Sequence, residues 1–98
     1  MQRGAWMFRL KEGKENAYRE AHKRVWPELI EAARVAGLKN HSVFIKGSVV
    51  FAYAESENLH ATMSLLASAA VTRRWDEAMA VLMGDPESEA LEEVCHFL

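Results

Sequence analysis

Apolar and polar residues alternate along residues 4–11. Trp6, Phe8 and Leu10 fall on one side of an extended segment, and the residues between them fall on the other. This period of two predicts a β-strand with one buried face.

Residues 14–36 repeat their apolar positions every three or four residues, which is typical of an amphipathic helix. Gly37 suits its end, because glycine readily adopts the left-handed conformation that closes many helices. Pro27 costs about 3 kcal/mol in a helix interior but little in a first turn. We therefore expect a kink or break near Val25–Trp26 and a second helical piece starting at Pro27.

Residues 41–46 and 48–55 are rich in β-branched and aromatic residues. They predict two strands joined by a tight hairpin at Lys46-Gly47-Ser48. Apolar residues lie on both sides of these strands, so both faces of the sheet are expected to be covered.

Two helices are predicted after the hairpin. Ser56 with Glu57 opens a short one that runs to about Ala67. Ser68 caps another, which Gly84 closes. Both lie between the hairpin and the C-terminal segment.

The remaining residues predict a loop at 85–89 and a last strand from Leu91 to Phe97, in which Cys95 is a small buried hydrophobe. The order β-α-β-β-α-β is the ferredoxin-like arrangement of the α+β class, formed here as a single domain over residues 1–98. Helices cover one face of such a sheet. A second copy of the chain is the natural cover for the other face, which gives a homodimeric α+β barrel.

The composition and charge of the chain argue against nucleic acids and membranes as its binding partners. The net charge of −2 comes from acidic and basic residues mixed along the chain, without the basic stripe of a nucleic-acid-binding protein or of one that binds an anionic membrane. No apolar stretch approaches the length of a membrane span, and the N-terminus does not resemble a signal peptide. One cysteine cannot form an internal disulfide, so a reducing cytoplasm is expected.

Metal and cofactor chemistry is not indicated. His22, His41, His60 and His96 have no zinc-binding spacing, and no glycine-rich phosphate loop or nucleophile elbow is present. We expect no metal and no cofactor.

The first helical segment carries an unusual face. Tyr18, His22 and Trp26 lie at about 0°, 40° and 80° around a helix, so they share one side. An ordinary hydrogen-bonded core explains such a face in many small domains. The alternative is a sugar site, because an imidazole exchanges protons near neutral pH and an indole packs against the C–H face of a sugar ring. Trp75 supplies a second indole.

The stretches "YREAHKRVWPEL", "AGLKNHSVF", "RRWDEAMAVLM" and "LEEVCHFL" resemble the L-rhamnose mutarotases. The resemblance implies a cytoplasmic, homodimeric α+β barrel that interconverts the α and β anomers of L-rhamnose, an isomerase of the aldose 1-epimerase type, without cofactor or metal. His22 matches the family's proton donor and Tyr18 a substrate-contacting tyrosine. Trp75 matches the first of two adjacent tryptophans that line the sugar site.

The chain departs from that family at two positions. His41 stands where the family usually has a sugar-contacting tyrosine, and Asp76 stands where it has the second tryptophan. Both changes favour polar contacts to a differently placed hydroxyl group, so L-fucose is an alternative substrate to L-rhamnose.

Anomer exchange needs one acid and one base to open the sugar ring. We expect His22 to act as the acid, with His41, Asp76 or a water as the base. Tyr18, Trp26 and Trp75 complete the expected substrate-binding set. Two other classes remain open for a small α+β barrel: a cofactor-free monooxygenase or haem-degrading enzyme, and a non-catalytic ligand-binding dimer.

Overall fold

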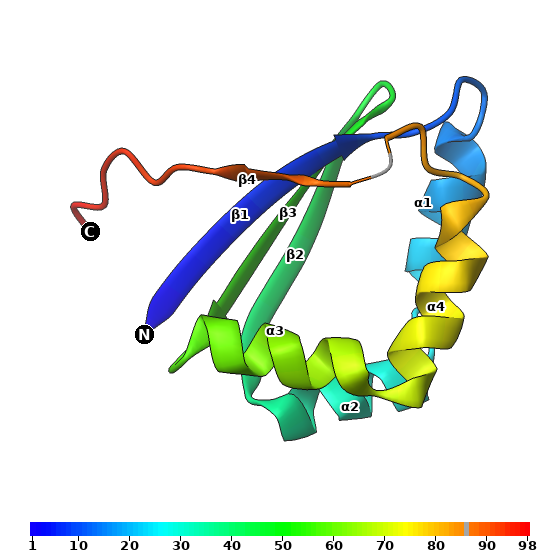
Figure 1. Cartoon of the computed structure of the whole chain (residues 1–98). Coiled ribbons are helices and arrows are strands. Elements are labelled where there is room, and N and C mark those ends of the chain that lie inside the picture. The colour runs from blue at the N-terminus through cyan, green and yellow to red at the C-terminus, as the bar shows by residue number, and fades with distance from the viewer. Residues whose placement is uncertain (86) are drawn as a thin grey trace.

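The computed structural model describes residues 1–85 and 87–98. These residues form, in chain order, β1 (Gln2–Arg9), α1 (Glu15–Lys23), α2 (Pro27–Ala36), β2 (Leu38–Lys46), β3 (Val49–Ser56), α3 (Leu59–Ser68), α4 (Ala70–Ala80) and β4 (Glu89–Leu91). The strands make one antiparallel sheet in the order β2-β3-β1-β4. All the helices lie on one side of it (Figure 1). The predicted ferredoxin-like α+β fold is confirmed. Each of its two helical connections consists of two helices, as the sequence also predicted.

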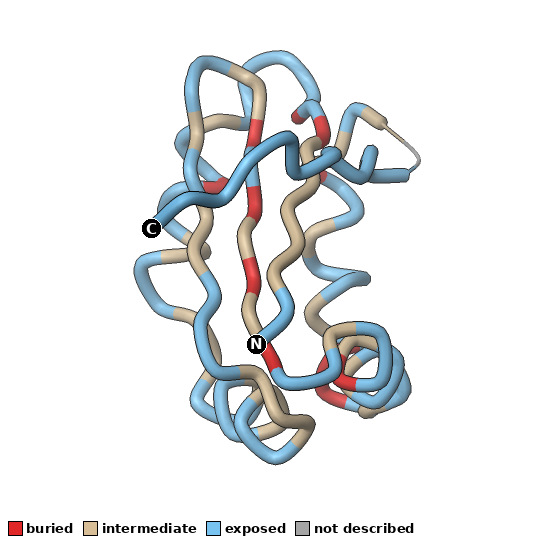
Figure 2. The backbone as a smooth tube through the Cα atoms, turned by 90° about the vertical axis from the view of Figure 1, so that its left-hand side faces the viewer, coloured by how far each residue is buried: buried red, intermediate tan, exposed pale blue. Residues whose placement is uncertain are grey.

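The strand register defines the inner face of the sheet. Phe8, Val50 and Ile45 lie side by side across β1, β3 and β2. They join the core together with Tyr18 of α1 and Leu82, which follows α4. Buried residues alternate with less buried ones along β3 (Figure 2), as a strand with one covered face requires.

The outer face carries the intervening residues. Met7, Phe51 and Phe44 form a row across the same three strands. Phe44 is 61% exposed in the single chain, although it is a large apolar residue. No helix of the described residues covers this face (Figure 1).

The predicted break in the first helical segment is confirmed. α1 ends at Lys23, and α2 begins at Pro27. In the first turn of a helix the missing N–H of proline costs no intrahelical hydrogen bond. Gly37 closes α2 in the left-handed conformation with φ of 102°. The hairpin prediction is confirmed as well, because β2 and β3 are joined through Gly47 and Ser48.

The predicted caps of the later helices are wrong. Asn58, rather than Ser56 with Glu57, caps α3. Its side-chain oxygen accepts a hydrogen bond from the backbone N–H of Ala61 at 3.1 Å. Ser56 ends β3 and is buried. Ala69, rather than Ser68, is the N-cap of α4, and no side chain caps that helix. The Ser68 hydroxyl instead donates to the carbonyl of Leu65 at 2.7 Å.

The predicted end of the last helix is also wrong. α4 ends at Ala80 rather than at Gly84. Gly84 packs against the end of β1: its N–H donates to the carbonyl of Arg9 at 2.8 Å, and a Cβ there would lie 2.9 Å from the carbonyl oxygen of Leu10. Of the predicted loop 85–89, residue 86 lies outside the described residues.

The predicted strand Leu91–Phe97 is wrong except for its first residue. β4 is Glu89–Leu91, which pairs with residues 5–7 of β1. Continuing this antiparallel register would exhaust β1 at Gln2, so residues 95–97 would have no neighbouring strand. Residues 92–98 are exposed, Cys95 among them, and the chain end projects beyond the sheet (Figure 1).

Candidate functional site

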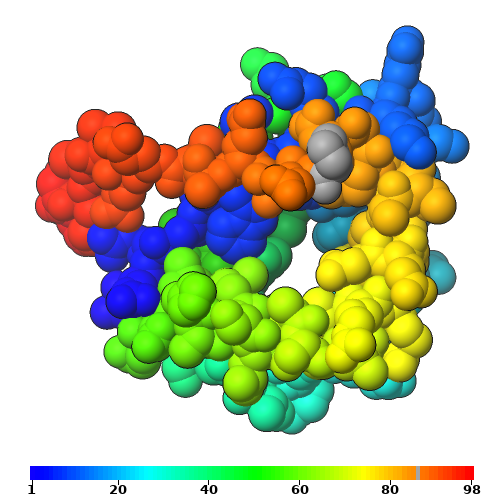
Figure 3. Space-filling view, viewed as in Figure 1, coloured from blue at the N-terminus to red at the C-terminus, as the bar shows by residue number. Residues whose placement is uncertain are grey.

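A cavity of about 820 Å³ lies between the inner face of the sheet and the helices. The space-filling view shows this hollow, bounded by β1, α3 and α4 (Figure 3). Five of the six site residues predicted from the sequence line it, namely Tyr18, His22, His41, Trp75 and Asp76. Residues more than fifty positions apart in the chain thus reach one cavity.

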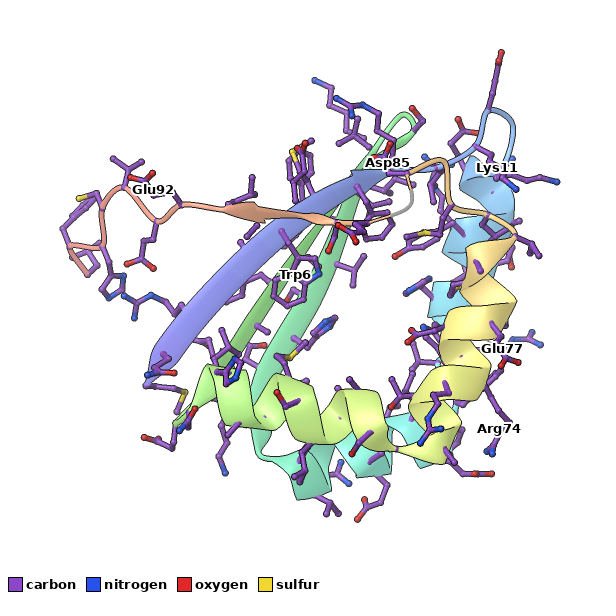
Figure 4. All side chains as sticks on the ribbon, viewed as in Figure 1. Trp6, Lys11, Arg74, Glu77, Asp85 and Glu92 are labelled. Atoms are coloured by element: carbon purple, nitrogen blue, oxygen red, sulfur yellow. The ribbon has the colours of Figure 1, made fainter. Side chains whose placement is uncertain are left out.

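The sheet makes room for the cavity through small residues on its central strand. On the inner face, β3 carries Ala52 opposite Trp6 and Ala54 opposite His41. The Trp6 side chain points from β1 into the space between sheet and helices, whereas Arg74 and Glu77 of α4 point away from it (Figure 4). The indole of Trp6 and the imidazole of His41 lie with centroids 6.3 Å apart above these alanines.

His22 is fixed by the backbone of its own helix. Its Nδ1 lies 2.9 Å from the carbonyl oxygen of Tyr18, one turn earlier. Because a carbonyl oxygen only accepts hydrogen bonds, Nδ1 carries the proton in the neutral ring. The other ring nitrogen, Nε2, is then the one available for proton transfer.

Aromatic rings enclose the imidazole. Tyr18 stacks on His22 with ring centroids 4.0 Å apart, and Trp75 meets the same imidazole edge-on at 5.2 Å. Trp26 packs edge-on against Trp75 at 5.1 Å but does not line the cavity. The predicted contact of Trp26 with a sugar stays a prediction. Trp26 sits at the break before α2, where it supports Trp75 from behind.

Tyr18 is held as a neutral phenol. Its side chain is only 5% exposed, and burial raises its pKa to about 12. Desolvation disfavours the phenolate, so the hydroxyl group keeps its proton at neutral pH and can serve as a hydrogen-bond donor.

His41 reaches the cavity through an irregularity in its strand. The pairing of β2 with β3 shifts between Leu38 and Asn40, which leaves Lys39 as an extra residue. Such a bulge reverses the alternation, so that both Leu38 and His41 line the cavity. Desolvation and the charge of His22 lower the pKa of His41, although its side chain is exposed in the single chain.

α4 brings further polar groups to the cavity. Asp76 follows Trp75 directly, and desolvation raises the pKa of its carboxyl group. Thr72, one turn earlier, also lines the cavity; its hydroxyl is buried and has no hydrogen-bond partner among residues 1–85 and 87–98. A buried hydroxyl group without a partner is costly, so this wall has unused hydrogen-bonding capacity.

Sequence reasoning missed Trp6, Thr72 and Lys39 as cavity residues. The alternation of β1 already places Trp6 on the inner side with Phe8, which is a usable signal. The Lys39 bulge has no local signature, and the orientation of Thr72 depends on how α4 packs on the sheet.

The described residues also bear on metals and membranes. Within residues 1–85 and 87–98, His, Cys, Asp and Glu side chains form no group of three or more that could hold a metal ion. No helix in that part of the chain is long and apolar enough to cross a membrane.

Fold and site together define a ferredoxin-like α+β protein whose cavity holds proton-transfer groups between aromatic walls. Residues 3–97 match the family model described as L-rhamnose mutarotase. The chain is 36% identical to the L-rhamnose mutarotase of Burkholderia orbicola over 94% of each chain. The chain belongs to the L-rhamnose mutarotase family, which is a family of isomerases.

Solved structures agree with this assignment. The crystal structure of an L-rhamnose mutarotase from Formosa agariphila superposes with a TM-score of 0.85 at 28% identity, over the full length of both chains. A putative antibiotic biosynthesis monooxygenase from Bordetella bronchiseptica superposes with a TM-score of 0.74 at 11% identity, over 95% of this chain and 96% of the other. At that identity the second likeness shows the fold alone.

Proposed function

We propose that this protein interconverts the α and β anomers of L-rhamnose by general acid–base catalysis. The observation that carries the proposal is the setting of His22: its Nδ1 is held by the carbonyl of Tyr18, and its ring lies between Tyr18 and Trp75 in the cavity. A proton-transfer group of fixed orientation beside apolar walls suits a sugar ring.

The reaction consists of proton transfers and one bond rotation. A proton delivered to the ring oxygen and one removed from the anomeric hydroxyl break the bond between C1 and the ring oxygen, and C1 becomes a carbonyl carbon. Rotation about C1–C2 and closure on the other carbonyl face give the second anomer. No electrons are gained or lost, so the proposal includes no cofactor and no metal.

Each wall residue has a role in this proposal. His22 delivers the proton to the ring oxygen from Nε2. The neutral Tyr18 hydroxyl donates to a sugar hydroxyl, and the Trp75 indole covers the apolar face of the ring and its 6-deoxy methyl group. His41 and Asp76 contact further hydroxyl groups of the sugar. Trp26, which lies behind the wall, holds Trp75 in place.

Replacing His22 tests the proposal. The rate of anomer exchange, measured by saturation-transfer NMR on L-rhamnose, should fall at least about tenfold in His22→Ala, because positioned proton transfer contributes ~10²–10⁴-fold. His60→Ala is the matched control, since His60 is exposed on α3 and does not line the cavity. An unchanged rate in a folded His22→Ala variant would contradict the mechanism.

L-Fucose is the second candidate substrate. The observation that favours it is the pair of polar residues, His41 and Asp76, that line the cavity. Both can hydrogen-bond a hydroxyl group placed differently from that of L-rhamnose, and such polar groups left unpaired penalise the wrong sugar. Exchange rates measured for L-rhamnose, L-fucose and L-rhamnulose under identical conditions rank the candidates.

We further infer that the protein is a homodimer joined through the outer face of the sheet. The row of Met7, Phe51 and Phe44 leaves apolar surface in water in the single chain. A contiguous apolar patch of this kind is typical of an interface. The cytoplasmic location and the single domain over residues 1–98 stay predictions.

A further inference from the structure

Ring opening needs a base as well as an acid, and His22 supplies one of the two. In the part of the chain that the structure describes, six residues with ionisable side chains line the cavity: Tyr18, His22, Arg34, Lys39, His41 and Asp76. The walls contributed by β1, β3 and α3 carry uncharged residues such as Trp6, Ala52 and Met63. The partner of His22, if it is a side chain, is one of the remaining five.

Three of the five are poor bases. Arg34 and Lys39 are cations and donate hydrogen bonds only. Tyr18 already stacks on the imidazole, and its pKa of about 12 keeps it protonated at neutral pH. His41 and Asp76 remain.

The position of Asp76 is less suitable. The residue before it, Trp75, is the one whose ring meets His22, and the next residue on a helix points about 100° away. Asp76 also borders a neighbouring recess, which it shares with Met79, Met83 and Asp85. Its side chain thus lies toward the margin of the cavity.

His41 belongs to the opposite wall. It comes from the sheet, whereas His22 comes from the helical layer, and the bulge at Lys39 turns its ring inward above the small residues of β3. The Trp6 indole lies beside it, with ring centroids 6.3 Å apart. A sugar ring held between sheet and helices would therefore meet one imidazole on each side.

We propose that His41 is the second proton-transfer group of the site and acts as the base when His22 acts as the acid. This inference rests on the proposed mutarotase function and assigns a role to one residue of its cavity.

The electrostatics of the pair supports opposite protonation states. Desolvation lowers the pKa of His41, and the positive charge of protonated His22 lowers it further. When His22 holds its proton, His41 therefore tends to be neutral, so one acid and one base coexist at the same pH. The raised pKa of Asp76, by contrast, comes from desolvation.

The proton balance closes within the pair. On ring opening, His41 takes the proton of the anomeric hydroxyl while His22 gives one to the ring oxygen; the C1–ring-oxygen bond breaks and the C1 carbonyl forms. On closure, the open-chain hydroxyl attacks the carbonyl, His22 takes its proton back, and His41 returns a proton to the new anomeric oxygen. Both histidines end as they began.

Two substitutions at position 41 test the base role. The glutamine of His41→Gln can still form hydrogen bonds but does not titrate near neutral pH. The phenylalanine of His41→Phe keeps an aromatic ring but can neither titrate nor form side-chain hydrogen bonds. We expect kcat to fall at least about tenfold in both variants, with KM changed by less than about threefold in His41→Gln. The acidic limb of the pH profile, where protonation disables the base, should disappear from the residual activity of His41→Gln.

A second measurement addresses the pair directly. In the NMR titration of the imidazole C–H signals, the pKa of His41 should rise in His22→Gln, because the neighbouring positive charge is removed. His60→Gln is the control and should leave the titration of His41 unchanged.

The outcomes separate the two proposals. If the unmodified protein does not accelerate exchange of L-rhamnose or L-fucose, the proposed function fails. If it does, but folded His41→Gln keeps the original kcat and the same acidic limb, only the role of His41 is overturned. An unchanged pKa of His41 in His22→Gln would also overturn the coupling of the pair.

Discussion

The imidazole of His22 is held from several sides by residues of two helices. The Tyr18 carbonyl fixes Nδ1, the Tyr18 ring covers one face, and Trp75 abuts the ring edge-on. A side chain restrained in this way has little rotamer freedom left to lose when substrate binds. At the scale of the residue, the site is therefore preorganised, which is what efficient proton transfer requires.

The buried phenol of Tyr18 predicts a specific loss of stability in alkali. The folded chain keeps this proton up to a pKa of about 12, whereas an unfolded tyrosine ionises near pH 10. Because the pKa is raised by folding, the stabilising contribution of the protonated Tyr18 phenol is fully present below about pH 10. That contribution is lost as the pH rises toward 12. The free energy of unfolding should thus fall by up to about 3 kcal/mol relative to Tyr18→Phe.

Urea unfolding of both proteins at intervals between about pH 9 and pH 11.5 measures this difference. Tyr53 is present in both, so its own ionisation cancels in the comparison. Parallel stability curves for the two proteins would show that the Tyr18 phenol is not protected by the fold.

At the scale of the element, two local irregularities position the site. The break between α1 and α2 frees Trp26 to support Trp75, and the bulge at Lys39 turns His41 inward. A continuous helix or a regular strand would move these side chains to another face, because each added or removed residue rotates all that follow.

The cap of α3 gives a prediction at the same scale. Asn58→Ala removes the side-chain acceptor at the start of the helix and should lower the free energy of unfolding by about 1 kcal/mol. Ser68→Ala should change it by a few tenths of a kcal/mol, because the exposed Ser68 caps no helix. Chemical denaturation measures both; a larger cost at Ser68 than at Asn58 would contradict the assignment of the caps.

At the scale of the whole molecule, the sheet has one covered and one bare face. The helices cover the row of Phe8, Val50 and Ile45, while Phe44 and Phe51 of the outer face remain in water. Burying such a face against a second copy gains roughly 25 cal/mol for each Å² of apolar surface removed from water.

A charge placed on the outer face should therefore prevent dimerisation. Phe44→Asp should sediment as a monomer at concentrations where the unmodified chain sediments as a dimer, because an unpaired carboxylate is costly to bury. Val35→Asp is the control: Val35 is 73% exposed, but it lies on α2, on the opposite side of the sheet. A dimer that survives Phe44→Asp would place the interface elsewhere.

The sequence by itself determined what local geometry controls. The alternation around Phe8 fixed a half-buried strand, Pro27 fixed the helix break, and Gly37 fixed the helix end, because each depends on backbone sterics or on periodicity within a few residues. The shared face of Tyr18 and His22 followed from their spacing of four within one helix.

Only the tertiary structure decided how distant segments meet. The inward turn of His41 depends on the pairing of β2 with β3, and the approach of Trp6 to His41 depends on the strand order. The short extent of β4 depends on its pairing with residues 5–7 of β1. These features arise from contacts between residues far apart in the chain, where no local preference outweighs packing and hydrogen-bond pairing.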